Sequence, residues 1–201
     1  MSIKIMNILI ATQNSDKFRI GKGLLSECGL ADSCFKNLGD VNISSQTEEY
    51  GDVINRALMK AQNAYRAIDK NERIDIFMGQ DDGMKYKNGE TDANSKEVVE
   101  KILHHNLLDI GETLIIVRAF ALLNGRGETI DKFETETPYK FIGNPKNIQL
   151  LDNKYPLSFV LSSLEGRKSM AEMGEEEAMK YYLRFSGERM KEAVEKIVRR
   201  G

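Results

Sequence analysis

Apolar and polar positions along the chain predict strands interleaved with helices. An apolar run from Ile5 to Ala11 predicts a buried strand, and the run stops at a polar cluster, residues 12–15. Apolar residues at helical spacing follow, namely Phe18, Leu24, Leu25 and Cys28. The stretch ILIATQNSDKFRI, residues 8–20, therefore predicts a strand that runs through a polar turn into a helix.

The same criteria predict the remaining elements. Runs of strand length occur at residues 33–38, 74–78, 113–123, 129–137 and 155–164. Apolar positions at 3.6-residue spacing predict helices over residues 51–69, 95–105, 175–184 and 187–200. The 113–123 segment is the most apolar and is expected to be a central strand, joined to 129–137 by a hairpin turn. Residues 83–94 are polar and are expected to form a loop.

Length and composition limit the possible classes of protein. A chain of 201 residues without a Pro-, Gly- or Ser-rich linker predicts a single domain, residues 1–201. Its 29 Lys and Arg and 31 Asp and Glu give a net charge of −2, which gives no global attraction to a nucleic acid polymer or an anionic membrane. The apolar start is too short to span a bilayer. The two cysteines, Cys28 and Cys34, are expected to be buried thiols in the cytoplasm.

The turn after the first strand is a candidate phosphate site. Unpaired N–H groups at a helix start carry partial positive charge, and Lys17 in the first helical turn adds a full charge. The alternative is structural, with Asn14 or Ser15 acting only as the N-cap and Lys17 as a solvated surface residue.

The strand over residues 74–78 is expected to end at Gly79 and to place two carboxylates, Asp81 and Asp82, at its carboxyl end. Ligands of α/β sheets bind at that end of the strands, and Mg²⁺ prefers oxygen ligands, so the pair predicts a magnesium site. The alternative is a solvated Asp-Asp-Gly turn.

Two further sets of polar residues carry groups suited to ligand binding or catalysis. Lys180 and Arg184 lie four residues apart on one predicted helix face, which is also common on solvated surfaces. His104 and His105 are adjacent rather than spaced for a metal, and we interpret them as residues of a helix end.

Three motifs occur in an order that resembles a known family. They are the T-x-N-x-x-K spacing of Thr12, Asn14 and Lys17, the polar segment with Glu48 before the helix that contains ALMKA, and the Asp81-Asp82 pair. Together they resemble the inosine triphosphate pyrophosphatase family, enzymes that hydrolyse aberrant purine nucleoside triphosphates. The resemblance is good over residues 1–85 and extends over the remainder only in outline.

The resemblance implies an α/β fold with a long, twisted mixed sheet flanked by helices, in two lobes around a central cleft, and a homodimer. It also implies a Mg²⁺-dependent hydrolysis of a nucleoside triphosphate to monophosphate and pyrophosphate. The implied roles are triphosphate binding by Thr12, Asn14, Lys17 and Lys60, and metal binding by Glu48, Asp81 and Asp82, with Asp82, Glu48 and Lys17 as the catalytic group.

The chain departs from the family pattern where the family contacts the base. Gly83-Met84 replaces a Ser-Gly-Leu sequence, and residues 153–156 replace a Phe-Gly-Tyr-Asp sequence. The family's Ser-His-Arg motif is absent, and its nearest equivalents are residues 182–184 or 184–186. Lys180 and Arg184 are the expected substitutes for base or phosphate contact, and the base preference does not follow from the sequence.

Two alternatives to an active enzyme remain open at this stage. One is a catalytically altered nucleotide-binding module on the same fold, in keeping with the changed base-contact motifs. The other is an unrelated α/β protein in which Asp81 and Asp82 form only a turn.

Overall fold

The computed structural model describes residues 5–44, 50–85, 91–92, 100–102, 107–143 and 156–200. The chain forms two compact units. The first unit consists of residues 1–81, 118–135 and 183–201, and the second of residues 82–117 and 136–182. The prediction of a single domain over residues 1–201 stays a prediction.

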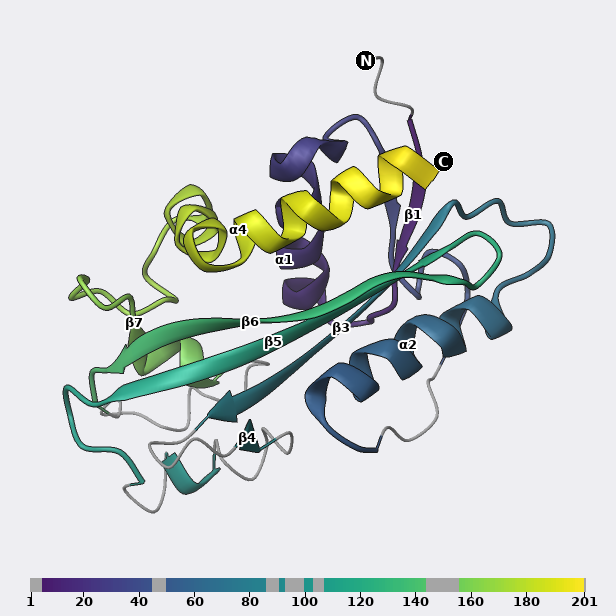
Figure 1. The fold of residues 1–201 in the computed structure, drawn as a ribbon. Helices are drawn as coiled ribbons and strands as arrows, with labels where there is room; N and C mark the ends of the chain where they lie inside the picture. Colours follow the sequence, from purple (N-terminus) through teal and green to yellow (C-terminus); the bar gives the residue numbers. More distant parts are fainter. Residues whose placement is uncertain are drawn as a thin grey trace. The chain divides into compact units, whose positions relative to one another are not determined.

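A seven-stranded mixed sheet has the order β2-β1-β3-β5-β6-β7, with β4 paired to β3 (Figure 1). Its strands are β1 (Asn7–Ile10), β2 (Cys34–Lys36), β3 (Ile76–Lys85), β4 (Thr91–Asp92), β5 (Thr113–Asn124), β6 (Thr129–Phe141) and β7 (Leu161–Ser162). β1 is parallel to both β2 and β3, whereas β4 and β7 are antiparallel to their neighbours. This confirms the expected α/β class and mixed sheet.

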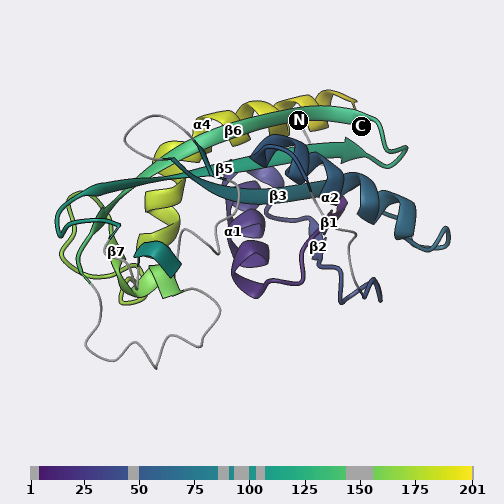
Figure 2. The same ribbon diagram turned by 90° about the horizontal axis from the view of Figure 1, so that it is seen from below.

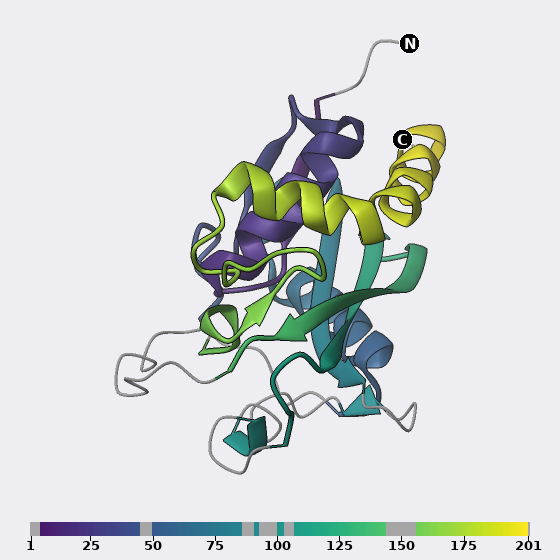
Figure 3. The same ribbon diagram turned by 90° about the vertical axis from the view of Figure 1, so that its left-hand side faces the viewer.

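The helical elements are α1 (Ser15–Leu25), a π-helical turn η1 (Ser26–Leu30), α2 (Val53–Ala67), a 3₁₀ turn η3 (Pro156–Phe159) and α4 (Glu175–Arg200). Within the first unit, α1 and α2 lie on opposite faces of the sheet (Figure 1). The part of α4 in this unit passes beside η1, since the Cys28 thiol contacts the Gly187 carbonyl oxygen at 3.5 Å (Figure 3). No helix of the described residues is both long enough and apolar enough to cross a bilayer.

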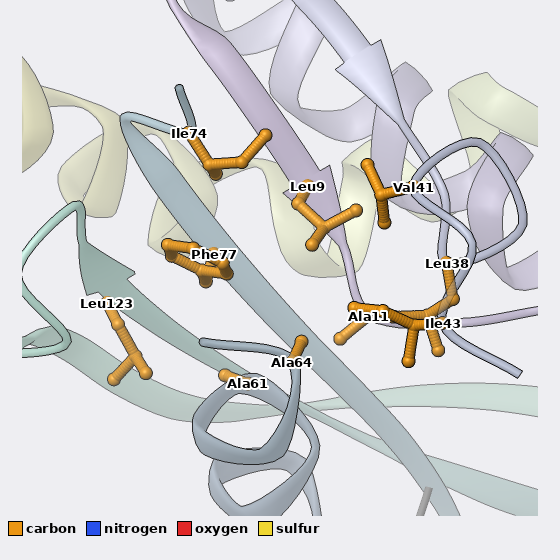
Figure 4. Close-up of a cluster of buried hydrophobic side chains, with 10 residues drawn as sticks. All are labelled: Leu9, Ala11, Leu38, Val41, Ile43, Ala61, Ala64, Ile74, Phe77 and Leu123. Atoms are coloured by element: carbon orange, nitrogen blue, oxygen red, sulfur yellow. The ribbon is translucent and has the colours of Figure 1, made fainter. Parts of the chain in front are cut away.

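The face of the first unit under α2 is closed by a cluster of aliphatic and aromatic side chains (Figure 4). The cluster comes from β1 and the residue after it, the segment after β2, α2, β3 with the segment before it, and β5. Its members are Leu9, Ala11, Leu38, Val41, Ile43, Ala61, Ala64, Ile74, Phe77 and Leu123. Two residues of the predicted apolar stripe of this helix, Ala57 and Ala61, are fully buried, whereas Tyr65 of the same stripe is exposed. The buried alanines allow the helix backbone to lie close to the strands.

The β5–β6 hairpin follows the sequence prediction, with a turn at residues 124–128 (Figure 2). Asn124 and Glu128 are joined by a backbone hydrogen bond of 2.9 Å, and the Asn124 side chain accepts hydrogen bonds from the N–H groups of Arg126 and Glu128. β6 continues to Phe141, beyond the predicted end at residue 137.

Several predicted boundaries were wrong. β3 does not end at Gly79 but continues to Lys85, so the predicted loop over residues 83–94 begins as strand, and β4 lies inside it. The predicted strand over residues 155–164 is instead η3 followed by a two-residue β7, because Val160 donates its N–H to Leu157 three residues earlier.

The two predicted C-terminal helices are one continuous helix, α4, since a single glycine, Gly187, lowers helix stability without breaking the helix. Both cysteines are free, but Cys28 is only half-buried and Cys34 is exposed, contrary to the expected burial. His104 and His105 lie outside the described residues, as does most of the predicted helix over residues 95–105.

Candidate functional site

The turn between β1 and α1 is built by two of the predicted site residues. Asn14 is the N-cap of α1, and its Oδ1 accepts hydrogen bonds from the N–H groups of Asp16 at 2.9 Å and Lys17 at 3.1 Å. Thr12 is buried, and its Oγ1 accepts the Asn14 N–H at 3.0 Å. Asn14 is thus the N-cap of α1, and triphosphate binding by Thr12 and Asn14 stays a prediction.

Three basic side chains surround one carboxylate in the first unit. Asp81 Oδ1 lies 3.2 Å from Lys17 Nζ and 2.6 Å from Lys60 Nζ. Asp81 Oδ2 lies 2.7 Å from Arg56 Nε. The Asp81 side chain is only 3% exposed, and those of Lys17, Arg56 and Lys60 are 18%, 22% and 13% exposed. We call these four residues the cation cluster.

The local structure explains why these side chains meet. Lys17 lies in the first turn of α1, and Arg56 and Lys60 lie one helical turn apart on α2. Side chains alternate along a strand, so Asp81 lies on the same face of β3 as Phe77 and Gly79, the face that α2 covers.

Gly79 sets the distance between α2 and β3. A Cβ at this position would lie 1.9 Å from the Ala57 carbonyl oxygen and 2.8 Å from the Ala61 backbone nitrogen. Only glycine fits such a close approach. The helix backbone rests on the strand here, and Lys60 Nζ reaches both the Asp81 carboxylate and, at 3.3 Å, the Gln80 carbonyl oxygen.

Arg56 is the member of the cation cluster that the sequence analysis missed. A signal for it was present, since Arg56 lies four residues before Lys60 and so shares its side of α2. The residue was overlooked because no motif of the resemblance includes it.

Two of the three predicted metal ligands, Asp81 and Asp82, lie within the described residues. Asp82 lies beside Asp81 within β3, so its half-buried side chain is on the opposite face of the strand. Glu48 lies outside the described residues. Within the described part of the chain, no group of three or more His, Cys, Asp or Glu side chains is placed to hold a metal ion. Metal binding by Glu48, Asp81 and Asp82 therefore stays a prediction.

The two basic residues predicted on α4 are exposed. Lys180 pairs with Glu176 at 2.7 Å, and the partners raise the pKa of Lys180 and lower the pKa of Glu176 mainly through this hydrogen bond. Arg184 lies over the ring of Phe185, 5.3 Å from its centroid. These contacts match the alternative of a solvated helix face, and substrate contact by Lys180 or Arg184 stays a prediction.

Ser186, one possible equivalent of the missing Ser-His-Arg motif, has a structural contact. Its hydroxyl lies 2.8 Å from the Thr135 hydroxyl, and both residues are buried. A buried hydroxyl pair of this kind fixes α4 to β6 within the first unit.

Comparison with known proteins supports the fold. No family model matches the chain, and no curated protein matches it at a significant level. The solved structure of the Staphylococcus aureus Ham1 protein matches with a TM-score of 0.60 and 17% identity, over 94% of this chain and 96% of that one. A Mycobacterium abscessus structure described as a nucleoside-triphosphatase and dITP/XTP pyrophosphatase matches with a TM-score of 0.53 and 19% identity, over 89% and 94%.

Both matches extend over most of each chain, so this chain has the fold of these two proteins. At identities of 17% and 19%, the two matches show the fold that the resemblance to the inosine triphosphate pyrophosphatase family implies. The implied fold, an α/β mixed sheet flanked by helices, is thereby confirmed.

Proposed function

We propose that this protein is a nucleoside triphosphate pyrophosphatase that hydrolyses a non-standard nucleoside triphosphate to monophosphate and pyrophosphate. The observation that carries the proposal is the convergence of Lys17 and Lys60, from two different helices, on Asp81. A fold shared with a protein described as a dITP/XTP pyrophosphatase supports it.

The chemistry of the cation cluster suits a triphosphate. Phosphoryl transfer is catalysed chiefly by positioning and by neutralising charge on the phosphate oxygens. Ammonium groups that are mostly shielded from water act more strongly on these oxygens than exposed ones do. In the proposed reaction a water oxygen attacks the α-phosphorus, the bond from that phosphorus to the bridging oxygen breaks, and pyrophosphate leaves.

Magnesium is part of this proposal, with Glu48 and Asp82 as the carboxylates that would bind it. Asp82 fits by its oxygen donors, the kind that Mg²⁺ prefers. Asp81 does not fit in the arrangement observed, because its two carboxylate oxygens lie against three cationic groups. When bound, Mg²⁺ would neutralise charge on the triphosphate oxygens.

A second candidate function is a nucleotide-binding module that has lost catalysis. The observation in its favour is at the positions matched to the family's base contacts, where Lys180 pairs with Glu176 and Ser186 is buried against Thr135. In this case a nucleotide would bind in Mg²⁺ and be recovered uncleaved. Calorimetry followed by chromatography of the titrated sample separates the two functions.

The proposal is tested by a panel of standard and damaged nucleoside triphosphates in Mg²⁺, with pyrophosphate release as the readout. We expect release from at least one purine nucleotide of the panel, with the monophosphate as the second product. If no nucleotide of the panel is hydrolysed, the proposed pyrophosphatase activity is refuted. Inorganic phosphate and a diphosphate as products would mean a different phosphohydrolase reaction. The homodimer and the cytoplasmic location stay predictions.

A further inference from the structure

We propose that Gln13 is a positioning residue for the turn between β1 and α1. This turn carries Thr12, Asn14 and Lys17, which are predicted to bind the triphosphate. The Gln13 side chain connects the turn to the segment after β2, residues 38–44, and so fixes the turn before a nucleotide binds. The inference rests on the proposed function in its choice of ligand. It goes beyond that function by assigning a role to a residue that none of the three sequence motifs specifies.

The first support is a pair of hydrogen bonds made by the Gln13 side chain. Its Nε2 group donates to the Ile43 carbonyl oxygen at 3.1 Å and to the Ser44 carbonyl oxygen at 2.7 Å. A primary amide nitrogen has two N–H donors, and here they meet two successive carbonyl groups of one segment. The contacts join residues 30 and 31 positions apart in the sequence. The amide therefore holds together two separate parts of the first unit.

The second support is a backbone hydrogen bond between the same turn and the same segment. Leu38 donates its N–H to the Thr12 carbonyl oxygen at 3.2 Å. Thr12 comes directly before Gln13, so the segment is attached at its start to one residue of the turn and at its end to the next. Two attachments to adjoining residues fix the orientation of the turn as well as its position.

The third support is that the segment itself is held in place. The Ile43 N–H donates to the Leu38 carbonyl oxygen at 2.9 Å, which closes the segment into a loop. Its apolar side chains belong to the same buried cluster as those of β1 and the residue after it, namely Leu9, Ala11, Leu38, Val41 and Ile43 (Figure 4). Burial of these side chains gives the carbonyl groups that Gln13 meets a fixed position.

Gln13 therefore acts on the ligand through its neighbours. The Thr12 hydroxyl oxygen accepts the Asn14 N–H, and Asn14 caps α1, so a shift of Gln13 would move both side chains and the first turn of the helix with them. A turn that is ordered before the ligand arrives lowers the entropy cost of binding. Loss of the Gln13 amide should weaken binding of the triphosphate and leave the hydrolysis of bound nucleotide almost unchanged.

The experiment compares the wild type with Gln13→Met, which keeps the side-chain length and removes both donors. The matched control is Gln62→Met, at a half-buried glutamine of α2 in the same unit. Hydrogen exchange of the Ile43 N–H, measured by NMR, reports on the attachment itself, because this group is bonded within the segment. KM and kcat for pyrophosphate release in Mg²⁺ report on its effect on the ligand.

We expect the Ile43 N–H to exchange about tenfold faster in Gln13→Met than in the wild type. KM should rise about fivefold, with kcat changed by less than about twofold, because the amide orders the binding turn and does not take part in the chemical step. Gln62→Met should match the wild type in both measurements.

Wild-type exchange at Ile43 or a wild-type KM in Gln13→Met would overturn the inference, and so would a fall in kcat at unchanged KM. If Gln13→Met does not fold, as judged by its thermal melt, the comparison is made with Gln13→Asn, whose amide is one methylene group too short to reach both carbonyls. Wild-type values in that variant overturn the inference.

Failure of this inference is distinct from failure of the proposed function. If a nucleotide binds but is not cleaved, the pyrophosphatase activity is refuted, and the Kd of that nucleotide replaces KM in the comparison. If a nucleotide is cleaved with a KM that does not depend on Gln13, the inference alone is refuted. A protein that neither cleaves nor binds any nucleotide refutes both.

Discussion

The α-carbon of Gly79 lies so close to Ala57 that a side chain at position 79 would put a Cβ 1.9 Å from the Ala57 carbonyl oxygen. Here the backbone of β3 lies directly against the backbone of α2. Two residues further along β3, Asp81 meets Arg56 and Lys60 from the same helix. The close approach is thus what brings the basic side chains of α2 within reach of the strand carboxylate.

Gly79→Ala should lower the free energy of unfolding by about 3 kcal/mol, because the added methyl group meets backbone that cannot move aside. The measurement is urea unfolding. The control is Gly187→Ala in α4, where a Cβ would find only ordinary contacts, 3.5 Å or more, with Leu183. This control should raise stability by about 0.5–1 kcal/mol, since alanine is the better helix former. A tolerated Gly79→Ala would mean that α2 does not rest on β3 at this point.

Asp81→Asn should also destabilise the fold, by about 3 kcal/mol, because three shielded cations lose one carboxylate partner that they share. Glu128→Gln is the control. It removes an exposed partner of Arg126 and should cost less than about 0.5 kcal/mol. Equal, small losses in the two variants would show that the cation cluster adds nothing to stability.

Thr135 and Ser186 form a buried hydroxyl pair that a double-mutant cycle can test. Thr135→Val and Ser186→Ala should each cost about 1–3 kcal/mol, because each leaves the other hydroxyl buried without this partner. The double variant should cost less than the sum, since both polar groups are then gone. Strict additivity in equilibrium unfolding would argue against the pair.

The two cysteines should differ in reactivity. Burial, and then the charge of Glu27, raises the pKa of the Cys28 thiol above its ordinary value of 9.0, while Cys34 is exposed. At pH 8, iodoacetamide should therefore label Cys34 first, and labelling of Cys28 should speed up as the pH rises past 9. Peptide mass spectrometry gives both rates, and labelling in urea is the control in which the difference disappears. Faster labelling of Cys28 in the folded protein would contradict the structure.

The raised pKa of the Cys28 thiol also makes the stability of the fold depend on pH. The folded protein holds the Cys28 proton more tightly than the unfolded chain does. The stabilisation from this group is therefore complete below pH 9 and is lost as the pH rises through the folded-state pKa. A Cys28→Ser variant should lack this contribution to the alkaline loss of stability.

Sequence patterns predicted the elements that have a strong local signal. The polar turn before α1 and the apolar stripe of α2 have clear helix signatures, and the most apolar run, residues 113–123, is the best candidate for a central strand. The predicted end of β3 at Gly79 is wrong because this glycine does not end the strand but accommodates the α2 backbone in mid-strand. A contact between segments that are distant in the sequence cannot be predicted from the local pattern of residues.

The candidate site was predicted in part for the same reason. Lys17, Lys60 and Asp81 were expected near one another, and they meet. Asp81 and Asp82 both lie within β3, where side chains alternate between the two faces, and their binding of one metal ion stays a prediction. Their place within the strand depends on where the strand ends, which the local pattern does not determine.

The central claim is that the cation cluster binds the triphosphate of a nucleotide that this protein cleaves. The most direct measurement is kcat/KM for pyrophosphate release in Mg²⁺ by the wild type, Lys17→Ala, Lys60→Ala and the control Lys132→Ala, an exposed lysine of β6. We expect a fall of about 100-fold or more in each of the first two variants and a change of less than about twofold in Lys132→Ala. Pyrophosphate release at the wild-type kcat/KM in both Lys17→Ala and Lys60→Ala would contradict the account.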